Sequence, residues 1–253
     1  MKITFVGNGK MALALASGLK DKYEIEVIGR CLTKLETFEK QLDSKIIKTH
    51  LSDSTDISNK TIIFCVKPYN LEEVGKKLTG KAKAVYSVLA GTTIQSLKNN
   101  INSNYYVRAM PNVAAEVNLS MTTLTGDESQ RDEAQKLFKS VGNTLWLGSE
   151  KELDIATALA GSGPAYLALI AEALTDGAVK EGLKRDDATR ITSGLFSGFS
   201  KLLEKKHPAL LKDSVMSPGG TTAAGYAELE NSSVRSAMMN TITKAYKRAC
   251  ELS

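Results

Sequence analysis

Short apolar, β-branched segments alternate with amphipathic ones over the first 148 residues of the chain. Compact apolar runs predict buried strands, and apolar residues spaced three or four apart predict helices. Strands are expected at residues 2–6, 24–28, 61–66, 84–89, 105–110, 121–124 and 144–147. Helices are expected at residues 11–19, 32–42, 71–78 and 128–141, with a polar stretch at 52–60. This alternation predicts a doubly wound α/β sheet.

The pattern changes after Gly148, where strand signals nearly stop and long helical periodicities begin. Helices are expected at residues 153–174, 187–203 and 234–252, the first interrupted by Gly161-Ser162-Gly163-Pro164. A helical segment of about 100 residues with apolar surface to spare is often a dimerisation domain. We therefore expect an α/β domain at residues 1–149 and an all-α C-terminal dimerisation domain at residues 150–253.

A glycine turn, Gly7-Asn8-Gly9-Lys10-Met11-Ala12, follows the first strand directly and opens the first helix. Gly7 permits a tight turn, Gly9 lets the backbone approach a pyrophosphate, and Ala12 lets the helix pack near the strand. The helix N-terminus adds unpaired N–H groups and a positive dipole end. The turn predicts a dinucleotide site in a Rossmann-like domain, against the alternative of a plain connection between strand and helix.

The second strand ends at Gly29-Arg30, about 20 residues past the glycines, where an NAD-preferring site usually carries Asp or Glu. A guanidinium at Arg30 suits a 2′-phosphate instead, and Lys34 follows one helical turn later. The prediction is NADPH as the preferred cofactor with NADH as the alternative. The competing interpretation is an ordinary solvated arginine.

A second glycine-rich segment, Val215–Gly225, contains Ser217-Pro218-Gly219-Gly220-Thr221-Thr222. The first two residues predict a turn, the glycines free the backbone, and the threonines begin the next helix. Several N–H groups and hydroxyls can then converge on one small anion such as a carboxylate. An ordinary helix N-cap is the alternative, although capping needs one such residue and not six.

Composition narrows the class of protein. The 253 residues carry a formal charge of +5 without a block of Lys and Arg, so no nucleic-acid partner is expected. Three distant cysteines without a C-x-x-C pair disfavour a disulfide framework and a zinc site and suit the cytoplasm. No run approaches 18 apolar residues and no metal motif occurs, so neither a membrane span nor a metal is expected. Lys67 follows a predicted strand, and the sequence supports a catalytic role and a positioning role for it equally.

Several motifs together resemble one family, the pyrroline-5-carboxylate reductases, in order over nearly the whole chain. They are Gly7–Ala12, Val66-Lys67-Pro68, Arg108-Ala109-Met110-Pro111-Asn112, Ala160–Tyr166, Asp176-Gly177 with Gly182-Leu183, and Leu211–Thr222. The GSGPAY and SPGGTT segments are specific, whereas the first glycines alone are not. The resemblance implies reduction of L-1-pyrroline-5-carboxylate to L-proline by hydride transfer from NAD(P)H, and a homodimer or a higher assembly of dimers formed through the C-terminal helices.

The resemblance also implies site residues between the two domains at the dimer interface. It places the cofactor on Gly7, Asn8, Gly9, Lys10, Met11, Arg30, Cys65, Val66, Lys67, Pro68, Ala90 and Asn112. It places the substrate on Glu150, Ser214, Ser217, Gly219, Gly220, Thr221 and Thr222, with the Thr222 hydroxyl at the ring nitrogen as the catalytic group. No metal is implied.

Two positions depart from the family pattern. Val113-Ala114 stand where Thr-Pro usually follows the asparagine, which removes a hydroxyl and a rigid turn. Met216 stands where a small or hydroxylic residue is common, and we expect it to pack away from the substrate. The rival functions are another NADP-dependent reductase of cyclic imines or small hydroxyacids, and a non-catalytic NADP-binding dimer.

Overall fold

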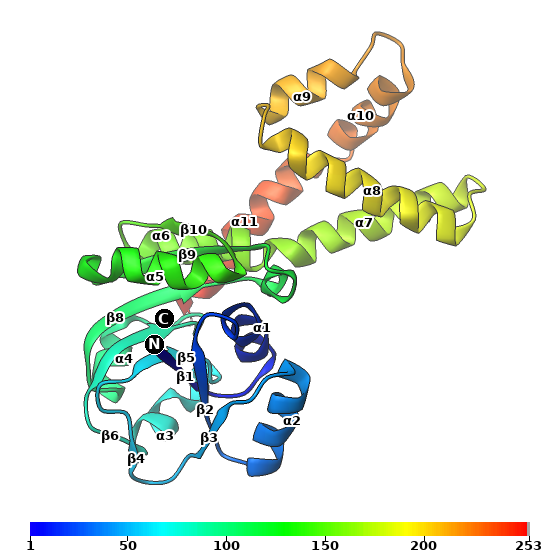
Figure 1. Cartoon of the computed structure of the whole chain (residues 1–253). Helices are drawn as coiled ribbons and strands as arrows, with labels where there is room; N and C mark the ends of the chain where they lie inside the picture. The colour runs from blue at the N-terminus through cyan, green and yellow to red at the C-terminus, as the bar shows by residue number, and fades with distance from the viewer. Residues whose placement is uncertain (252–253) are drawn as a thin grey trace. The chain divides into compact units, whose positions relative to one another are not determined.

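The computed structural model describes residues 1–251, which divide into two compact units. Unit 1 holds residues 1–164 together with the end of the last helix from Lys244 on. Unit 2 holds residues 165–243. Figure 1 labels the helices and strands of both units.

Unit 1 is built on one sheet, which within the described residues has eight strands in the order β3-β2-β1-β5-β7-β8-β9-β10. The strands are β1 Lys2–Val6, β2 Glu24–Gly29, β3 Ile47–His50, β5 Thr61–Phe64, β7 Ala82–Ser87, β8 Ser103–Met110, β9 Ser120–Gly126 and β10 Gly142–Trp146. Neighbours from β3 to β8 are parallel, β9 runs antiparallel to β8, and β10 is parallel to β9. The strand order reverses beside β1, which makes the sheet doubly wound as predicted.

Helices cover both faces of this sheet, so its central strands are apolar on both sides. They are α1 Lys10–Leu19, α2 Leu32–Leu42, α3 Leu71–Gly75, α4 Ile94–Asn100, α5 Arg131–Phe138 and α6 Glu150–Ala156. Ile3 and Phe5 of β1 pack with residues of α1, α2 and α5. Val6 points to the other face and packs with residues of α3 and α4. Alternate side chains of β1 thus pack into two separate hydrophobic cores, one on each face of the sheet.

Two expectations in this region are wrong in detail. The helix predicted to reach Leu78 ends at Gly75, and Leu78–Thr79 forms strand β6. That strand pairs with β4, Thr55–Asp56, which lies inside the predicted polar stretch. At Gly75 the chain packs closely on the end of α4, because a Cβ there would lie 2.5 Å from the carbonyl oxygen of Asn100. The helix predicted over 128–141 is α5 flanked by two short 3₁₀ turns.

Unit 2 is helical throughout, as predicted for the C-terminal region. Its helices are α7 Gly163–Lys180, α8 Arg185–Leu203, α9 Pro208–Val215, α10 Thr221–Asn231 and α11 Val234–Glu251, with the first two residues of α7 and the end of α11 in unit 1. Within residues 165–243 the buried residues are Thr175, Ala188, Thr192 and Leu211. Large apolar side chains such as Leu169, Ile191 and Leu195 are more than half exposed. A unit with so little core of its own leaves its apolar faces for a partner.

The first long helix is interrupted earlier than predicted, by a π-helical turn at Thr157–Gly161, and α7 already begins at Gly163, inside the predicted interruption at 161–164. By length and composition alone, the stretch Glu150–Lys180 is long and apolar enough to cross a membrane, although it has no uninterrupted apolar run of that length. Helices that are covered by other parts of a protein pass the same test. Its apolar face is the kind of surface that a dimerisation helix presents.

Candidate active site

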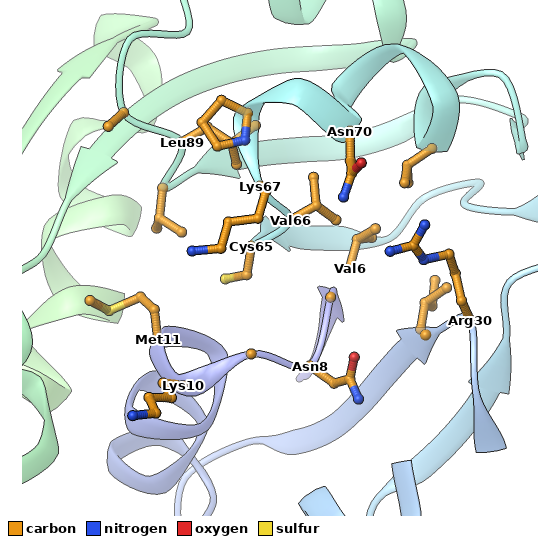
Figure 2. Close-up of a pocket in the computed structure, with 18 of the residues that line it drawn as sticks. Val6, Asn8, Lys10, Met11, Arg30, Cys65, Val66, Lys67, Asn70 and Leu89 are labelled. Atoms are coloured by element: carbon orange, nitrogen blue, oxygen red, sulfur yellow. The ribbon is translucent and has the colours of Figure 1, made fainter. Parts of the chain in front are cut away.

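A cavity of about 690 Å³ opens at the carboxyl ends of β1, β2, β5, β7 and β8 (Figure 2). Open α/β sheets bind ligands at this edge, where the strand order reverses. The predicted cofactor residues Gly7, Asn8, Gly9, Lys10, Met11, Arg30, Cys65, Val66, Lys67, Pro68 and Ala90 all line it. Residues that sequence reasoning had not assigned to the site also line it: Val6, Ile28, Gly29, Leu51, Asn70, Val74, Val88, Leu89, Met110 and Pro111. Their signal was available, since each lies at or just beyond the end of a strand or in the short helix that follows it.

The two glycines of the first glycine turn have different structural roles. Gly7 adopts φ +107°, and a Cβ there would lie 2.8 Å from the carbonyl oxygen of Cys65, so only glycine fits. Gly9 precedes α1 with φ −82°, and a Cβ there would meet no atom of residues 1–251 within 4 Å. This open space lies in front of a helix N-terminus that no side chain of the described residues caps. The turn therefore fits an anionic pyrophosphate.

Arg30 lies at one end of the cavity with Asn8 and Asn70, while Met11 and Leu89 lie at the other (Figure 2). Its side chain is 58% exposed, and its Nη1 lies 3.4 Å from Oε1 of Glu73 on α3. An exposed guanidinium beside the end of β2 fits a 2′-phosphate. Glu73 was not anticipated, because the sequence does not reveal that α3 comes close to this strand end.

Cys65 and Lys67 line the middle of the cavity. Burial raises the pKa of the Cys65 thiol, which keeps the sulfur protonated and unsuited to act as a base or nucleophile. Lys67 is exposed and extended, and Pro68 follows it at the start of a 3₁₀ turn. The Lys67 side chain extends into the middle of the cavity near Cys65 (Figure 2).

Asn112 is outside the set of described residues that line the cavity, one position beyond Pro111. Its Oδ1 accepts a hydrogen bond from the N–H of Ala114 at 3.0 Å. Its Nδ2 donates to the carbonyl oxygen of Ala160 at 3.0 Å. In this structure the side chain thus joins the end of β8 to the π-helical turn.

Glu150, the first residue of α6, lies in unit 1, whereas the other predicted substrate residues lie in unit 2. Its Oε1 accepts from Nη1 of Arg108 and from the N–H of Ile94, each at 2.9 Å. Arg108 is 1% exposed, and its Nη2 donates to Asp154 Oδ1 at 2.7 Å. The sequence places Arg108 within a family motif but does not reveal these partners.

The second glycine turn closes in front of α10. The N–H of Gly220 donates to the carbonyl oxygen of Ser217 at 3.0 Å, and Gly219 adopts φ +69°. Helix α10 begins at Thr221, and no side chain within residues 1–251 caps it. Ser217, Thr221 and Thr222 are exposed. The turn therefore presents free N–H groups and hydroxyls together, as a carboxylate requires.

Ser214 lies on α9, where its hydroxyl donates to the carbonyl oxygen of Leu211 at 2.7 Å. Residues 1–251 hold no group of three or more His, Cys, Asp or Glu side chains placed to bind a metal ion.

Comparison with known proteins matches both parts of the chain. Residues 150–252 match the family model for pyrroline-5-carboxylate reductase dimerisation. Residues 2–91 match the model described as NADP oxidoreductase, coenzyme F420-dependent.

Full-length relatives agree with these matches. Pyrroline-5-carboxylate reductase of Helicobacter pylori strain J99 is 34% identical, over 97% of this chain and 98% of its own length. The solved enzyme of Streptococcus pyogenes superposes with a TM-score of 0.86 at 31% identity, covering 99% and 98% of the two chains. The Plasmodium falciparum enzyme, solved with NADP bound, gives a TM-score of 0.81 at 27% identity, covering 100% of this chain and 99% of its own. The chain therefore belongs to the pyrroline-5-carboxylate reductase family.

Proposed function

We propose that this chain reduces L-1-pyrroline-5-carboxylate to L-proline, the final step of proline biosynthesis. The observation that carries the proposal is the exposed glycine turn Ser217–Gly220 before the uncapped helix α10, in a chain of this family. A dinucleotide cavity alone would suit many reductases, whereas a carboxylate grip is needed for an imino acid.

The proposed cofactor is NADPH in preference to NADH. The N–H groups at the start of α1, beside Gly9, would bind the pyrophosphate, and Arg30 would bind the 2′-phosphate. Residues Cys65–Pro68, Ala90 and Asn112 would flank the ribose and the nicotinamide. When bound, NADPH supplies the hydride that reduces the imine carbon.

The proposed substrate grip uses Ser217, Gly219, Gly220 and Thr221 for the carboxylate, with Ser214 nearby on α9. The Thr222 hydroxyl would orient the ring nitrogen. A threonine hydroxyl is too weak an acid to supply a proton unaided, so solvent is the ultimate source. The protonated imine is the better hydride acceptor, and most of the acceleration comes from holding the reacting carbons in contact.

The chain carries a dimerisation domain of its family and forms a homodimer. An assembly of several dimers is proposed as the finer state. The proposed compartment is the cytoplasm, which suits three cysteines that form no disulfide within the described part of the chain.

A panel of imines tests the function directly. Purified protein is mixed with pyrroline-5-carboxylate, pyrroline-2-carboxylate or piperideine-2-carboxylate, with NADPH and with NADH, and cofactor absorbance is followed. The highest kcat/KM for pyrroline-5-carboxylate with NADPH is expected. Preference for another imine would indicate a related reductase. NADPH binding without reduction of any imine would indicate a non-catalytic dimer.

A further inference from the structure

A buried arginine joins the sheet of unit 1 to helix α6. Arg108 lies on β8, and its Nη1 and Nη2 donate to Glu150 and Asp154 at 2.9 and 2.7 Å. The two carboxylates are four residues apart and therefore share one face of the helix. A guanidinium that is 1% exposed needs such partners, because a buried unpaired charge is costly. We call Arg108, Glu150 and Asp154 the brace.

Glu150 extends the brace to a third element. The same Oε1 that accepts from Arg108 also accepts from the backbone N–H of Ile94, the first residue of α4, at 2.9 Å. A first-turn N–H has no acceptor within its own helix. Glu150 supplies that acceptor and so anchors the loop between β7 and α4.

The anchored loop is a wall of the cofactor cavity. Val88, Leu89 and Ala90 line the cavity, and Gly91 then turns the chain toward Ile94 with φ +64°. On the neighbouring strand, Met110 and Pro111 line the cavity two and three residues beyond Arg108. The brace therefore connects both walls at this end of the cavity.

A second link ties the β8 wall to the π-helical turn that follows α6. Asn112 Nδ2 donates to the carbonyl oxygen of Ala160, which would bond to residue 164 in a regular helix. Residue 164 is proline and has no N–H, so this carbonyl oxygen is free for Asn112. Arg108 and Asn112 thus tie β8 at two points to the segment that begins at Glu150.

We propose that Glu150 is a positioning residue: its carboxylate holds the Ala90 loop and Arg108 in register and so sets the shape of the cavity end that receives the nicotinamide. That this end of the cavity receives the nicotinamide rests on the proposed function. The competing role is direct contact with the substrate through Oε2, which makes no hydrogen bond within residues 1–251.

Two conservative variants separate these roles. Glu150→Gln loses the charge but keeps an oxygen at the same reach, so it still accepts from Ile94 and Arg108. Glu150→Asp keeps the charge but is one methylene shorter, so it loses the Ile94 contact. Positioning predicts that the glutamine variant resembles wild type and that the aspartate variant is impaired. A charge acting on the substrate predicts the reverse.

The first measurement is hydrogen exchange at the Ile94 amide in the ligand-free protein, which needs neither cofactor nor turnover. About tenfold faster exchange is expected in Glu150→Asp, with wild-type protection in Glu150→Gln. Equal exchange in all three proteins would overturn the proposal. This result stands whichever imine the enzyme reduces, so it separates failure of the brace from failure of the proposed function.

The second measurement is kinetics at saturating NADPH. Glu150→Asp is expected to lower kcat about five- to tenfold with KM for the imine within about twofold, because the loop and not the substrate contact is disturbed. Glu150→Gln is expected to keep at least about half of the wild-type kcat. A raised imine KM in Glu150→Gln with a normal Glu150→Asp would assign Glu150 to the substrate instead, and wild-type kinetics in both would remove its positioning role.

Glu152 provides the matched control. It lies on the same helix, is exposed, and accepts from the N–H of Gly148 at 2.8 Å, away from Arg108. Glu152→Gln and Glu152→Asp are expected to leave exchange at Ile94 and kcat within about twofold of wild type. An effect as large as that of Glu150→Asp would show that any change on α6 acts alike and would overturn the proposal.

Discussion

Glu73 Oε1 lies 3.4 Å from Nη1 of Arg30, so the arginine proposed to bind a 2′-phosphate already faces a carboxylate. Both side chains are at least half exposed, and solvent weakens their mutual attraction. A phosphate placed at Arg30 would gain the guanidinium but would also be repelled by Glu73. The pair would therefore set the size of the proposed preference for NADPH over NADH.

Charge changes at this pair are expected to change the KM for NADPH and to leave the KM for NADH nearly unchanged. Arg30→Ala should raise KM for NADPH about tenfold or more, while KM for NADH changes less than about twofold. Glu73→Gln should lower KM for NADPH about two- to threefold, because a repulsive charge is removed. Steady-state kinetics with both cofactors measure this.

Glu72 is the control for Glu73, since it is exposed, adjacent in sequence and paired with Lys76 at 2.6 Å. Glu72→Gln should change neither cofactor constant. Equal losses of NADPH and NADH in Arg30→Ala would contradict the 2′-phosphate assignment.

The two glycines of the first turn should fail in different ways when replaced by alanine. Gly7→Ala forces a Cβ to 2.8 Å from a carbonyl oxygen at φ +107°, which should cost about 1–3 kcal/mol of stability. Gly9→Ala has room in the described protein and should melt like wild type, yet lose NADPH affinity because its Cβ occupies the proposed pyrophosphate space. Thermal melts and NADPH fluorescence titration distinguish the two. Unchanged NADPH affinity in Gly9→Ala would move the pyrophosphate elsewhere.

Thr222→Ala should bind NADPH as wild type does but lose most of kcat/KM for pyrroline-5-carboxylate, by about a hundredfold. Thr222→Ser keeps the hydroxyl and should recover a large part of the rate. Both variants change an exposed residue in the first turn of α10, so folding should be little affected. Unchanged turnover in the alanine variant would remove Thr222 from the site.

Acid stability should depend on Glu26, a buried residue of β2. Burial disfavours its charge, but hydrogen bonds from Lys60, Thr4 and Thr49 together hold the pKa of its carboxyl below the ordinary 4.5. The folded pKa is the lower one, so the stabilisation is present at neutral pH and is lost as pH falls below about 4.5 toward the folded pKa. Urea unfolding across this range should show wild type losing this contribution.

Glu26→Gln should be about 2 kcal/mol less stable near neutral pH and should show a flatter dependence on acid, because the group no longer titrates. Glu36→Gln, an exposed change on α2, should reproduce the wild-type profile. A parallel profile in Glu26→Gln would assign the acid sensitivity to other carboxylates.

The homodimer should depend on the exposed apolar face of α7. Leu169 is 66% exposed, and Leu169→Glu should shift sedimentation toward the monomer by placing a charge in the contact. Ile47→Glu makes the same kind of change at an exposed position of β3 and should remain dimeric. A dimeric Leu169→Glu would place the contact on another face.

Local sequence patterns were sufficient to predict a helix or strand where its bounds follow from its own apolar residues. Helix α2 begins and ends at the predicted residues, and β1 matches its predicted range. The cavity assembles at the predicted strand ends because parallel strands bring their carboxyl ends to one edge. Eleven of the twelve predicted cofactor residues line it, Asn112 being the exception.

Long-range partners could not be predicted in this way. The close approach of Gly75 to the backbone of Asn100 joins α3 to α4, and the role of Glu150 depends on Arg108 and Ile94. Glu26 has the pattern of an exposed strand residue, yet it is buried, and its partner Lys60 lies 34 positions later. Such contacts join segments far apart in sequence, where periodicity carries no information.

The small core of unit 2 has a consequence for how much enzyme a cell keeps folded. Only four of residues 165–243 are buried, so the stability of this unit must come largely from contact with a second copy of the chain. Unfolding that includes dissociation depends on concentration, and each tenfold dilution lowers the unfolding free energy of the dimer by about 1.4 kcal/mol. The rate of synthesis therefore governs the lifetime of each copy as well as the number of copies, and scarce chains are the ones most exposed to proteolysis.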